Sequence, residues 1–446
     1  MDKLIDMPVG AQRIIQQLAL CGYKAYIVGG CVRDSLLGIR PSDWDICTAA
    51  TPEEVKACFP DKRIIDTGLK HGTVTVMMGR MPYEVTTFRV DGDYSDNRRP
   101  DSVTFVRDIR EDLARRDFTI NAIAYNESSG IVDPYGGIDD LSRGTINCVG
   151  NPNARFSEDA LRILRALRFA STYGFRIGEK TTKAIHDNAG LLTHISAERI
   201  QAELLKLLNG ENVLRVLLDF PDVITTIIPE LKPCVGFDQN NKYHQYTVYD
   251  HIAHAVANYK GNDAIVKVAL LLHDIGKPQC YTEDENGGHF HGHGVPSSEL
   301  AAQVLKRLRF DNDSQKAITE LVLYHDATID PTPRVVKRWL NKIGFDQFLR
   351  LMDVRLADME AHAINESRIK RRNEALDLAW EIVRERQCFT LKDLAINGHD
   401  VMSIGVPEGK QVGTILLAAL NAVFEGEVPN EKGALLNFSK KFQENT

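Results

Sequence analysis

Two aspartates, Asp43 and Asp45, stand two positions apart shortly after a glycine-rich segment at residues 28–38. On an extended strand this spacing points both carboxylates to one face. Two carboxylates that face triphosphate oxygens are the ligands that a pair of Mg²⁺ ions needs for in-line phosphoryl or nucleotidyl transfer. A D-x-D pair alone is common on protein surfaces, but its coupling to the upstream G-G-x-x-R-D pattern favours the chemical interpretation.

The glycine-rich segment has the features of a phosphate-binding turn. An apolar run at residues 26–28 predicts a short buried strand that ends in two glycines. Gly30 lets backbone N–H groups approach phosphate oxygens at the start of a helix that Arg33 and Asp34 open. Arg33 adds a charge-assisted contact to the same phosphates.

A second pattern, at residues 157–169, could read a nucleobase. Ser157 is a natural N-cap for a helix on which Asp159 and Arg162 are surface neighbours. A carboxylate beside a guanidinium matches the amino donor and ring-nitrogen acceptor that cytosine and adenine share, and mismatches uracil and guanine. The alternative is a plain salt bridge on an amphipathic helix, which also carries Arg165 and Arg168.

Histidines concentrate in the middle of the chain. Eight of the thirteen fall between residues 244 and 325. His251, followed by His273-Asp274 on an apolar helix, supplies imidazole and carboxylate metal ligands from separate helices. Asp358 is the best distal carboxylate, and His293 and His325 would suit a second metal.

Composition predicts an ordinary globular protein of about two to four domains, given 446 residues with 43% hydrophobic and 26% charged side chains. No stretch approaches the length of a membrane span, and the acidic start is unlike a signal peptide. Eight cysteines without a C-x-x-C pair indicate reduced thiols in a cytoplasm. The net charge of −7 gives no global support for nucleic-acid binding, which must rest on local basic patches.

The elements that would position these residues follow from local signals. Helices are predicted over residues 10–22 and from Thr51, and strands over residues 73–78 and 83–89. Glu84 on the second strand is either a third carboxylate beside the aspartate pair or a strand-edge charge. Further expectations are a helix with Arg115, Arg116 and Asp117 at its head, a closing turn at residues 133–141, and helical structure from about residue 155 onward.

Five ordered motifs carry a family resemblance: G-G-x-V-R-D, D-W-D, R-R-D-F-T-I-N-A, D-P-x-G-G-x-x-D-L and E-D-x-x-R. Together they resemble the bacterial-type (class II) tRNA nucleotidyltransferases, the CCA-adding enzymes and their poly(A) polymerase relatives. The resemblance implies an α+β protein with a polymerase-beta-like nucleotidyltransferase head, followed by an all-helical neck, body and tail. Its substrates would be tRNA, CTP and ATP.

The resemblance also implies roles for individual residues. Asp43 and Asp45 would hold Mg²⁺, whereas Glu84 is a candidate third catalytic carboxylate only from its place on the predicted strand. The implied nucleotide contacts are Gly30 and Arg33 on the triphosphate, Arg116 and Asp117 near the ribose and phosphates, Asp159 and Arg162 on the base, and Arg165 and Arg168 in support.

The histidine pattern resembles the HD phosphohydrolase superfamily, which implies a second divalent metal held by His251, His273, Asp274 and Asp358. The alternative is a decayed HD fold that only braces tRNA. The domains would be a head at 1–145, a neck at 146–235, an HD domain at 236–365 and a tRNA-binding tail at 366–446.

Several functions stay open at this point. Full CCA addition leads, and retention of a turn-rich loop at residues 89–100 separates the chain from CC-only relatives but not from A-adding enzymes. A poly(A) polymerase is the nearest rival, and an HD hydrolase or RNA-binding regulator with an inactive head is a minor one. Basic clusters around Arg334 and Arg368 could grip tRNA phosphates or simply be solvated helix faces. The sequence carries no signal for oligomeric state.

Overall fold

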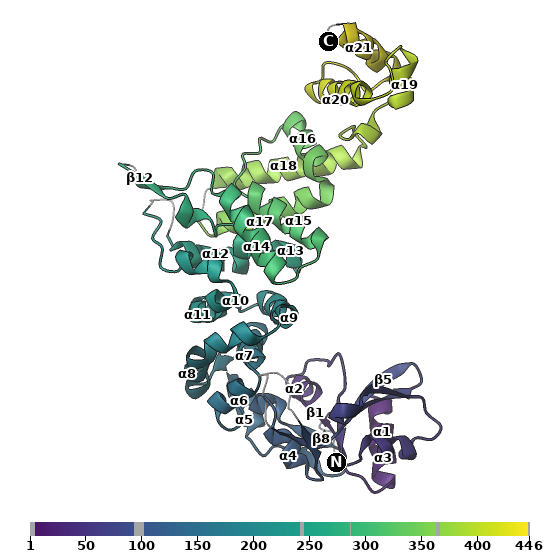
Figure 1. The fold of residues 1–446 in the computed structure, drawn as a ribbon, viewed down its shortest axis with the longest axis vertical. Coiled ribbons are helices and arrows are strands. Elements are labelled where there is room, and N and C mark those ends of the chain that lie inside the picture. Colours follow the sequence, from purple (N-terminus) through teal and green to yellow (C-terminus); the bar gives the residue numbers. More distant parts are fainter. Residues whose placement is uncertain (1–4, 93–101, 241–244, 286, 363–365, 445–446) are drawn as a thin grey trace. The chain divides into compact units, whose positions relative to one another are not determined.

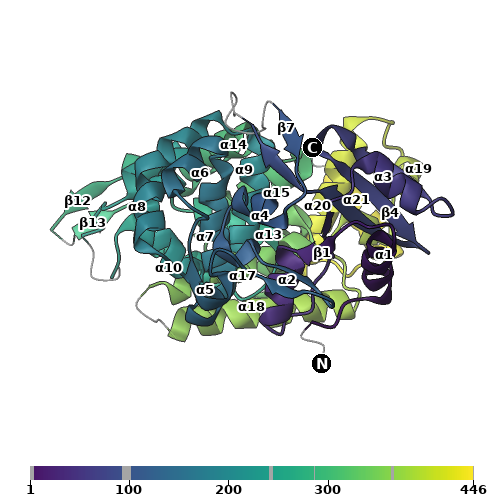
Figure 2. The ribbon, with the colours of Figure 1, turned by 90° about the horizontal axis from the view of Figure 1, so that it is seen from below.

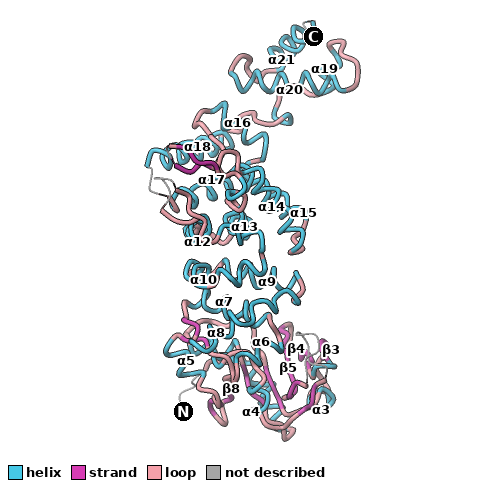
Figure 3. The backbone as a smooth tube through the Cα atoms, turned by 60° about the vertical axis from the view of Figure 1, so that its left-hand side comes forward, coloured by secondary structure: helices cyan, strands magenta, loops and turns pink. Residues whose placement is uncertain are grey.

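The computed structural model describes residues 5–92, 102–240, 245–285, 287–362 and 366–444. It divides into two compact units, Met1–Pro229 and Glu230–Thr446, and each is described by itself. Strands concentrate in the first unit, and helices make up most of the second (Figure 3). Among the described residues, no helix has both the length and the apolar character needed to cross a membrane.

A seven-stranded sheet forms the core of the head, in the order β3-β4-β5-β2-β1-β8-β9 (Figure 1). Its strands are β1 (Ala25–Val28), β2 (Ile46–Thr48), β3 (Ile64–Gly68), β4 (Thr73–Met78), β5 (Met81–Thr87), β8 (Ala124–Asn126) and β9 (Gly130–Val132). All neighbours are antiparallel except β2 and β5, which run parallel. The fully apolar β1 is buried along its whole length because it lies inside the sheet.

The helices of the head are α1 (Val9–Leu20), α2 (Gly30–Leu36), α3 (Pro52–Cys58), α4 (Ile109–Ala114) and α5 (Gly137–Arg143). Helix α1 packs against β1, β2, β5 and α3 (Figure 2). Thr51 and Glu54 form a reciprocal capping box that starts α3 with Pro52 in its first turn, as the sequence predicts. A separate pair, β6 (Arg89–Asp91) and β7 (Val103–Phe105), flanks the predicted loop, most of which lies outside the described residues.

Two local predictions for the head are wrong. Arg115 caps the C-terminal end of α4, so the R-R-D motif follows a helix instead of opening one. Thr119–Asn121 after it forms only a single 3-10 turn. Residues 133–141 are not just a turn, because Asp133 accepts backbone N–H bonds from Gly137 and Ile138 at the start of α5.

The neck is made of α6 (Pro152–Glu158), α7 (Leu161–Tyr173), α8 (Glu179–Asn188), α9 (Ala197–Leu208), α10 (Val213–Asp219) and α11 (Pro221–Ile227). The continuous helix predicted at residues 157–169 is wrong. Ser157 lies in the last turn of α6, Asp159 is extended, and α7 begins at Leu161. The side chain of Asp159 accepts the N–H of Leu161, a local bond that competes with helix continuation.

The second unit begins with α12 (Val248–Asn258), α13 (Ala264–Leu272), α14 (Gly294–Arg307), α15 (Asn312–Tyr324), α16 (Pro333–Ile343), α17 (Phe345–Glu360) and α18 (Glu366–Arg384). Three further helices, α19 (Gly398–Ser403), α20 (Lys410–Glu425) and α21 (Lys432–Glu444), gather around their own apolar core at the C-terminal end (Figure 1).

The α+β class is confirmed, whereas the all-helical body is wrong in detail. The two-residue strand β11 (Arg176–Ile177) pairs with β10 (Thr145–Ile146), and a hairpin of β12 (Thr282–Asp284) and β13 (Gly287–His289) interrupts the second unit. The division into four domains remains a prediction.

Candidate active site and histidine–aspartate cluster

Three carboxylates of the head face one cavity of about 1180 Å³, as the sequence hypothesis requires. Asp43 and Asp45 lie in the segment just before β2, not on the strand itself. Because Ile46 pairs with Val85 in the parallel β2–β5 register, Asp45 and Glu84 occupy neighbouring positions at the same end of these strands. The backbone carbonyl of Asp45 accepts the N–H of Val28, which ties the segment to β1.

The charges in this cluster repel one another. Partial burial raises the pKa of Asp45, Asp43 and Glu84 raise it further, and the charge of Arg116 offsets part of this shift. All three residues keep solvent exposure, and among the described residues no lysine or arginine lies within ion-pair distance of any of the three carboxylates. A group of like charges left open to solvent is suited to binding a divalent cation, so the donor set fits Mg²⁺.

The glycine turn lies close to the cationic side chain of Arg116, which is also in the head. Gly29 has φ +76°, and a Cβ there would lie 2.9 Å from Nη1 of Arg116. Gly30 begins α2, and a Cβ there would be in ordinary contact with Arg33. A side chain at Gly29 would therefore be strained and would displace Arg116.

Arg33 is buried, with protein groups surrounding its guanidinium. Nη1 donates to Asn121 at 2.6 Å, and Nε donates to Asp34 at 2.9 Å. The guanidinium carbon also lies 5.0 Å from the ring centre of Phe169 and 4.9 Å from that of Tyr173. Arg33 thus connects the glycine turn to α7, and its contact with a triphosphate remains a prediction.

A second, smaller cavity of about 310 Å³ gathers most of the predicted nucleotide-binding residues. This volume is at the lower end of small-molecule sites. Its lining is made of Arg115, Arg116, Asp117, Asp159, Leu161, Arg162, Arg165 and Arg199. Charged side chains from the end of α4, the break between α6 and α7, and α9 therefore converge around a space suited to one nucleotide.

Asp117 and Arg165 form the most tightly paired contact of this cavity. Arg165 donates from Nε and Nη2 to Oδ2 of Asp117 at 2.8 and 2.6 Å, and Asn121 donates to Oδ1 at 3.0 Å. Burial alone would raise the pKa of Asp117, but Arg165 and Asn121 outweigh it and hold the pKa well below its usual range. Arg116 is similarly paired with Asp112 on α4 at 3.2 Å.

The side chains of the predicted base-reading residues, Asp159 and Arg162, pair with other residues, although the backbone N–H of Arg162 donates to the carbonyl of Asp159 at 3.0 Å. Arg162 donates to Glu158 at 2.6 Å, and Asp159 accepts from Arg199 of α9 at 2.7 Å. The i, i+3 pairing is lost because the helix breaks at Asp159, and each charge finds another partner. Glu158 and Arg199 also belong to this cavity region, and the sequence analysis gave neither of them a role. Glu158 is the first residue of the E-D-x-x-R motif.

Arg168 lies on α7 about one turn after Arg165, outside the lining of this cavity. It donates to Glu203 of α9 at 3.3 Å, and its guanidinium carbon lies 4.3 Å from the ring centre of Phe169. Arg165 also lies over this ring, at 5.6 Å. The stacking holds two of the arginines of α7 in place.

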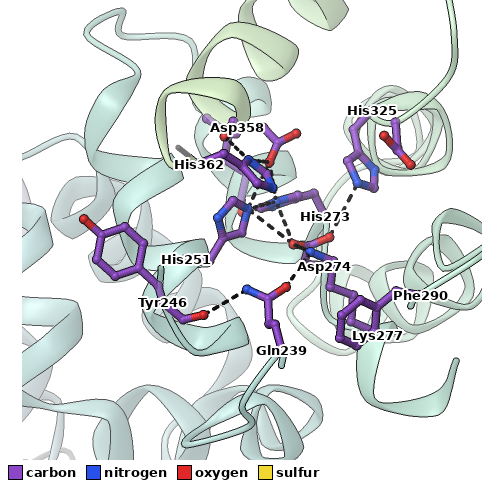
Figure 4. A network of polar contacts seen from close by, with 12 residues as sticks. Gln239, Tyr246, His251, His273, Asp274, Lys277, Phe290, His325, Asp358 and His362 are labelled. Atoms are coloured by element: carbon purple, nitrogen blue, oxygen red, sulfur yellow. Dashed lines mark hydrogen bonds and ion pairs between the residues drawn. The ribbon is translucent and has the colours of Figure 1, made fainter. Parts of the chain in front are cut away.

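In the second unit, the predicted metal ligands come together in a buried histidine–aspartate cluster (Figure 4). Nε2 of His251 lies 3.2 Å from Nε2 of His273 and 2.9 Å from Oδ1 of Asp358. Oδ2 of Asp274 lies 3.4 Å from His251 and 3.3 Å from His273. These four groups come from α12, the end of α13 and α17, so only the tertiary structure joins them.

The other oxygen of Asp274 faces a second histidine pair. Its Oδ1 lies 3.1 Å from Nε2 of His293 and 3.5 Å from Nε2 of His325, and these two nitrogens are 3.0 Å apart. Each of the three histidines His273, His293 and His325 directs Nδ1 at a backbone carbonyl, which orients Nε2 toward the cluster. The donor set therefore fits two transition-metal ions that share one carboxylate.

Burial and the neighbouring carboxylates shift the pKa values of two cluster histidines, His251 and His273, in opposite directions. Burial lowers the pKa of His251 to about 4. Burial alone would also lower the pKa of His273, but Asp274 and Asp358 raise it to about 10. Lys277, which the sequence analysis did not single out, donates to Asp274 at 2.7 Å and to Gln239 at 3.0 Å.

Comparison with known proteins places this geometry in a class. The model of the poly(A) polymerase head domain matches residues 25–147, and that of the "Probable RNA and SrmB- binding site of polymerase A" matches residues 174–233. A model of tRNA nucleotidyltransferase domain 2 matches residues 295–439. The chain is thus a nucleotidyltransferase of the poly(A) polymerase class.

Whole-chain relatives narrow this class. The CCA-adding enzyme of Geobacillus kaustophilus is 55% identical over 94% of this chain and 93% of its own, and that of Geobacillus stearothermophilus is 38% identical over the same shares. The crystal structure of the Bacillus stearothermophilus CCA-adding enzyme in complex with CTP matches with a TM-score of 0.73 at 33% identity, covering 98% of this chain and 99% of that one. The chain belongs to the CCA-adding enzyme family.

Proposed function

We propose that this chain adds C, C and A in order to the 3′ end of tRNA, using CTP and ATP and releasing pyrophosphate. The observation that carries the proposal is the pairing of two features in one unit: an open cluster of three carboxylates, and a nucleotide-sized cavity lined by Asp159 and Arg162. In a member of the CCA-adding family, these are the parts needed for catalysis and for selection of the base without a template.

The reaction divides between the two cavities. The 3′ oxygen of tRNA forms a bond to the α-phosphorus, the bond from that phosphorus to the bridging oxygen breaks, and pyrophosphate leaves. Asp43, Asp45 and Glu84 would hold Mg²⁺, which neutralises phosphate charge and favours ionisation of the 3′ hydroxyl. Arg116, held by Asp112 behind the glycine turn, supplies fixed positive charge near the phosphates.

Base selection is assigned to Asp159 and Arg162. Their present partners, Arg199 and Glu158, hold the two side chains at the lining of the same cavity. A cytosine or adenine edge offers a donor to the carboxylate and an acceptor to the guanidinium, whereas uracil and guanine offer the reverse. Glu158 and Arg199 act as positioning residues in this scheme.

Incubation of the purified protein with tRNA transcripts tests the proposal. Transcripts ending before CCA, after C and after CC would receive CTP, ATP, UTP or GTP singly, and CTP with ATP. Ordered addition that stops after A is the expected result. Addition of A only to the CC-ended transcript would instead identify an A-adding enzyme, and unlimited A-tailing a poly(A) polymerase.

A second activity is favoured by the histidine–aspartate cluster. We propose that His251, His273, Asp274 and Asp358 bind a divalent metal, that His293 and His325 bind a second one, and that the site hydrolyses phosphate esters. Its support is the position of Asp274, with one oxygen toward each histidine pair. Metal analysis of the purified chain and hydrolysis of a generic phosphate ester test it. A chain that neither retains metal nor hydrolyses esters would indicate that this region only braces tRNA.

A further inference from the structure

Beside the histidine–aspartate cluster lies a cavity of about 320 Å³ whose charged lining is mostly cationic. We call it the arginine pocket, after Arg355, Arg368, Arg371 and Arg372. It shares Asp326 and Arg368 with the cleft that is lined by Asp274, His293, His325 and Asp358. A ligand in the cleft would therefore extend directly into the arginine pocket.

Arg355 links the pocket to the cluster. It lies on α17, three residues before Asp358, and so on neighbouring positions of one helix face. Its Nη1 donates to the backbone carbonyl of His325 at 3.2 Å and also to that of Ala327. Arg355 thus binds the backbone at and just after His325, one candidate metal ligand, and lies on the helix that carries Asp358, another candidate ligand.

The positive charge of the pocket is incompletely neutralised. Four arginines and one aspartate line it, and the hydrogen bonds of Arg355 described above go to backbone carbonyls only. The Nε of Arg355 is buried and finds no hydrogen-bond partner in the part of the chain that the structure describes. A buried guanidinium donor without a partner is costly, and an anion entering the pocket would relieve that cost.

The other arginines differ in what holds them. Arg372 is mainly structural, because its Nε donates to the carbonyl of Met352 at 3.0 Å. Arg371 is half-exposed and pairs with Asp330 at the surface, and Arg368 lies 3.8 Å from Asp326. An exposed pair such as Arg371 with Asp330 contributes little, so the Arg371 side chain is available to a phosphate that binds it more strongly.

We propose that the arginine pocket binds a second phosphate group of the substrate that is hydrolysed at the histidine–aspartate cluster. The substrate class is a nucleotide carrying two phosphates, either free or as the end of an RNA chain. The proposal rests on the hydrolase function proposed above. Water adds its oxygen to the phosphorus at the cluster, the ester P–O bond breaks, and the leaving oxygen takes a proton, giving an alcohol and inorganic phosphate.

The pocket is tested first by binding, without any metal. Adenosine 3′,5′-bisphosphate and adenosine 3′-phosphate are titrated calorimetrically into the full chain, into Arg371→Gln and into Arg355→Met. Each substitution is expected to weaken bisphosphate binding about 10-fold, the loss of one charge-assisted contact, with little effect on the monophosphate. Asp330→Asn is expected to tighten bisphosphate binding, because it frees Arg371.

Arg338→Gln is the matched control. Arg338 is also a half-exposed arginine paired with a carboxylate, Glu425, but it lies outside the pocket. All these variants have the same head, so any nucleotide that binds there contributes equally to each titration and does not affect the difference between variants. Arg371→Gln and Arg355→Met that bind bisphosphate as the unmodified chain does, with unchanged unfolding temperatures, would overturn the proposal.

Hydrolysis separates this proposal from the one on which it rests. With Mn²⁺ supplied, Arg371→Gln should raise KM for the bisphosphate and leave kcat unchanged. An RNA oligonucleotide with a 3′-phosphate, compared with the free bisphosphate, identifies the natural source by the higher kcat/KM. If the unmodified chain hydrolyses none of them while binding still depends on Arg355 and Arg371, the hydrolase function fails and the phosphate pocket stands.

Discussion

The chain carries two groups of carboxylates that fit metal ions, and they are built in opposite ways. In the head, Asp43, Asp45 and Glu84 face a wide cavity. In the second unit, Asp274 and Asp358 are 1% and 8% exposed, and imidazoles surround them. The carboxylates of the first group repel one another, whereas those of the second group already lie against histidine and lysine side chains.

The difference matches the way each kind of ion is held. Mg²⁺ keeps much of its water and is bound by a few carboxylates together with substrate phosphates, so its site must stay open to the substrate. Transition metals are held by a dense set of imidazole and carboxylate donors that can form ahead of substrate binding. The two groups therefore predict one ion that comes with the nucleotide and another that resides in the protein.

The strongest test of this contrast removes an open carboxylate. Asp45→Asn should lower nucleotide addition by about 10³-fold, because the metal supplies several kcal/mol of charge stabilisation. It should not lower the unfolding temperature, since partial burial and its acidic neighbours already raise the pKa of Asp45. Single-turnover addition to tRNA and calorimetric melting measure the two effects.

Asp61→Asn, an exposed head aspartate away from the cavity, is the control for this substitution and should be silent in both measurements. A large loss of stability in Asp45→Asn would mean that the open cluster is a structural feature instead.

The buried cluster should respond in the reverse manner. Asp274→Asn removes the carboxylate between both histidine pairs and should weaken metal retention by about 100-fold. Nucleotide addition at saturating Mg²⁺ should be unchanged, because the head carboxylates are in the other unit. Metal content after dialysis against a chelator gives the first value, and the tRNA assay the second. Equal metal content in Asp274→Asn and the unmodified chain would contradict a resident ion at this cluster.

A smaller effect is expected at the base-reading residues. Asp159→Ala should reduce the preference for CTP over UTP by about 30-fold, the equivalent of about 2 kcal/mol of base discrimination. Arg199→Gln leaves the carboxylate but removes its partner, so it should reduce the preference less. Competition between CTP and UTP on one transcript measures both. If Asp159→Ala slows all nucleotides equally, the residue holds the fold of the neck and does not read the base.

The smallest effect concerns a carboxylate that is paired and buried within the head–neck region. Asp117→Asn should lower the free energy of unfolding by about 1.5 kcal/mol at pH 7, because it removes the charge partner of Arg165. The pKa of Asp117 is lowered in the folded state, so its contribution is present above the ordinary pKa near 4 and is lost as the pH falls below it. The difference between the two proteins should shrink from pH 6 to pH 3 in denaturant titrations.

The motifs alone pointed to many of the residues that line the two cavities of the first unit. The aspartate pair, the glycine turn and the E-D-x-x-R segment are local patterns whose chemistry depends on residue type and spacing. The helix that begins at Thr51 and the two strands that follow it are local predictions as well, and they are confirmed, although the second strand covers residues 81–87 where 83–89 was predicted. The roles of the individual site residues remain predictions.

The errors arose where side-chain bonds competed with the periodicity of a segment. Residues 157–169 have the periodicity of one helix, but Asp159 bonds to the N–H of Leu161 and to Arg199 from α9, and the helix breaks there. The R-R-D motif lies at the C-terminal end of α4, where Arg115 and Arg116 bond to Asp112 of the same helix. Side-chain bonds outweighed the intrinsic preference of each segment.

The sequence by itself determined the class of chemistry, because the ligands for Mg²⁺ and the pattern for base recognition lie within short segments. Only the tertiary structure decided three things: that Glu84 joins Asp45 through a parallel strand register, that Asp159 pairs with Arg199 while Arg162 pairs with Glu158, and that Asp274 stands between two histidine pairs. Most of these contacts join residues tens of positions apart, and the one between His251 and Asp358 spans more than a hundred. No spacing along the chain encodes such a contact.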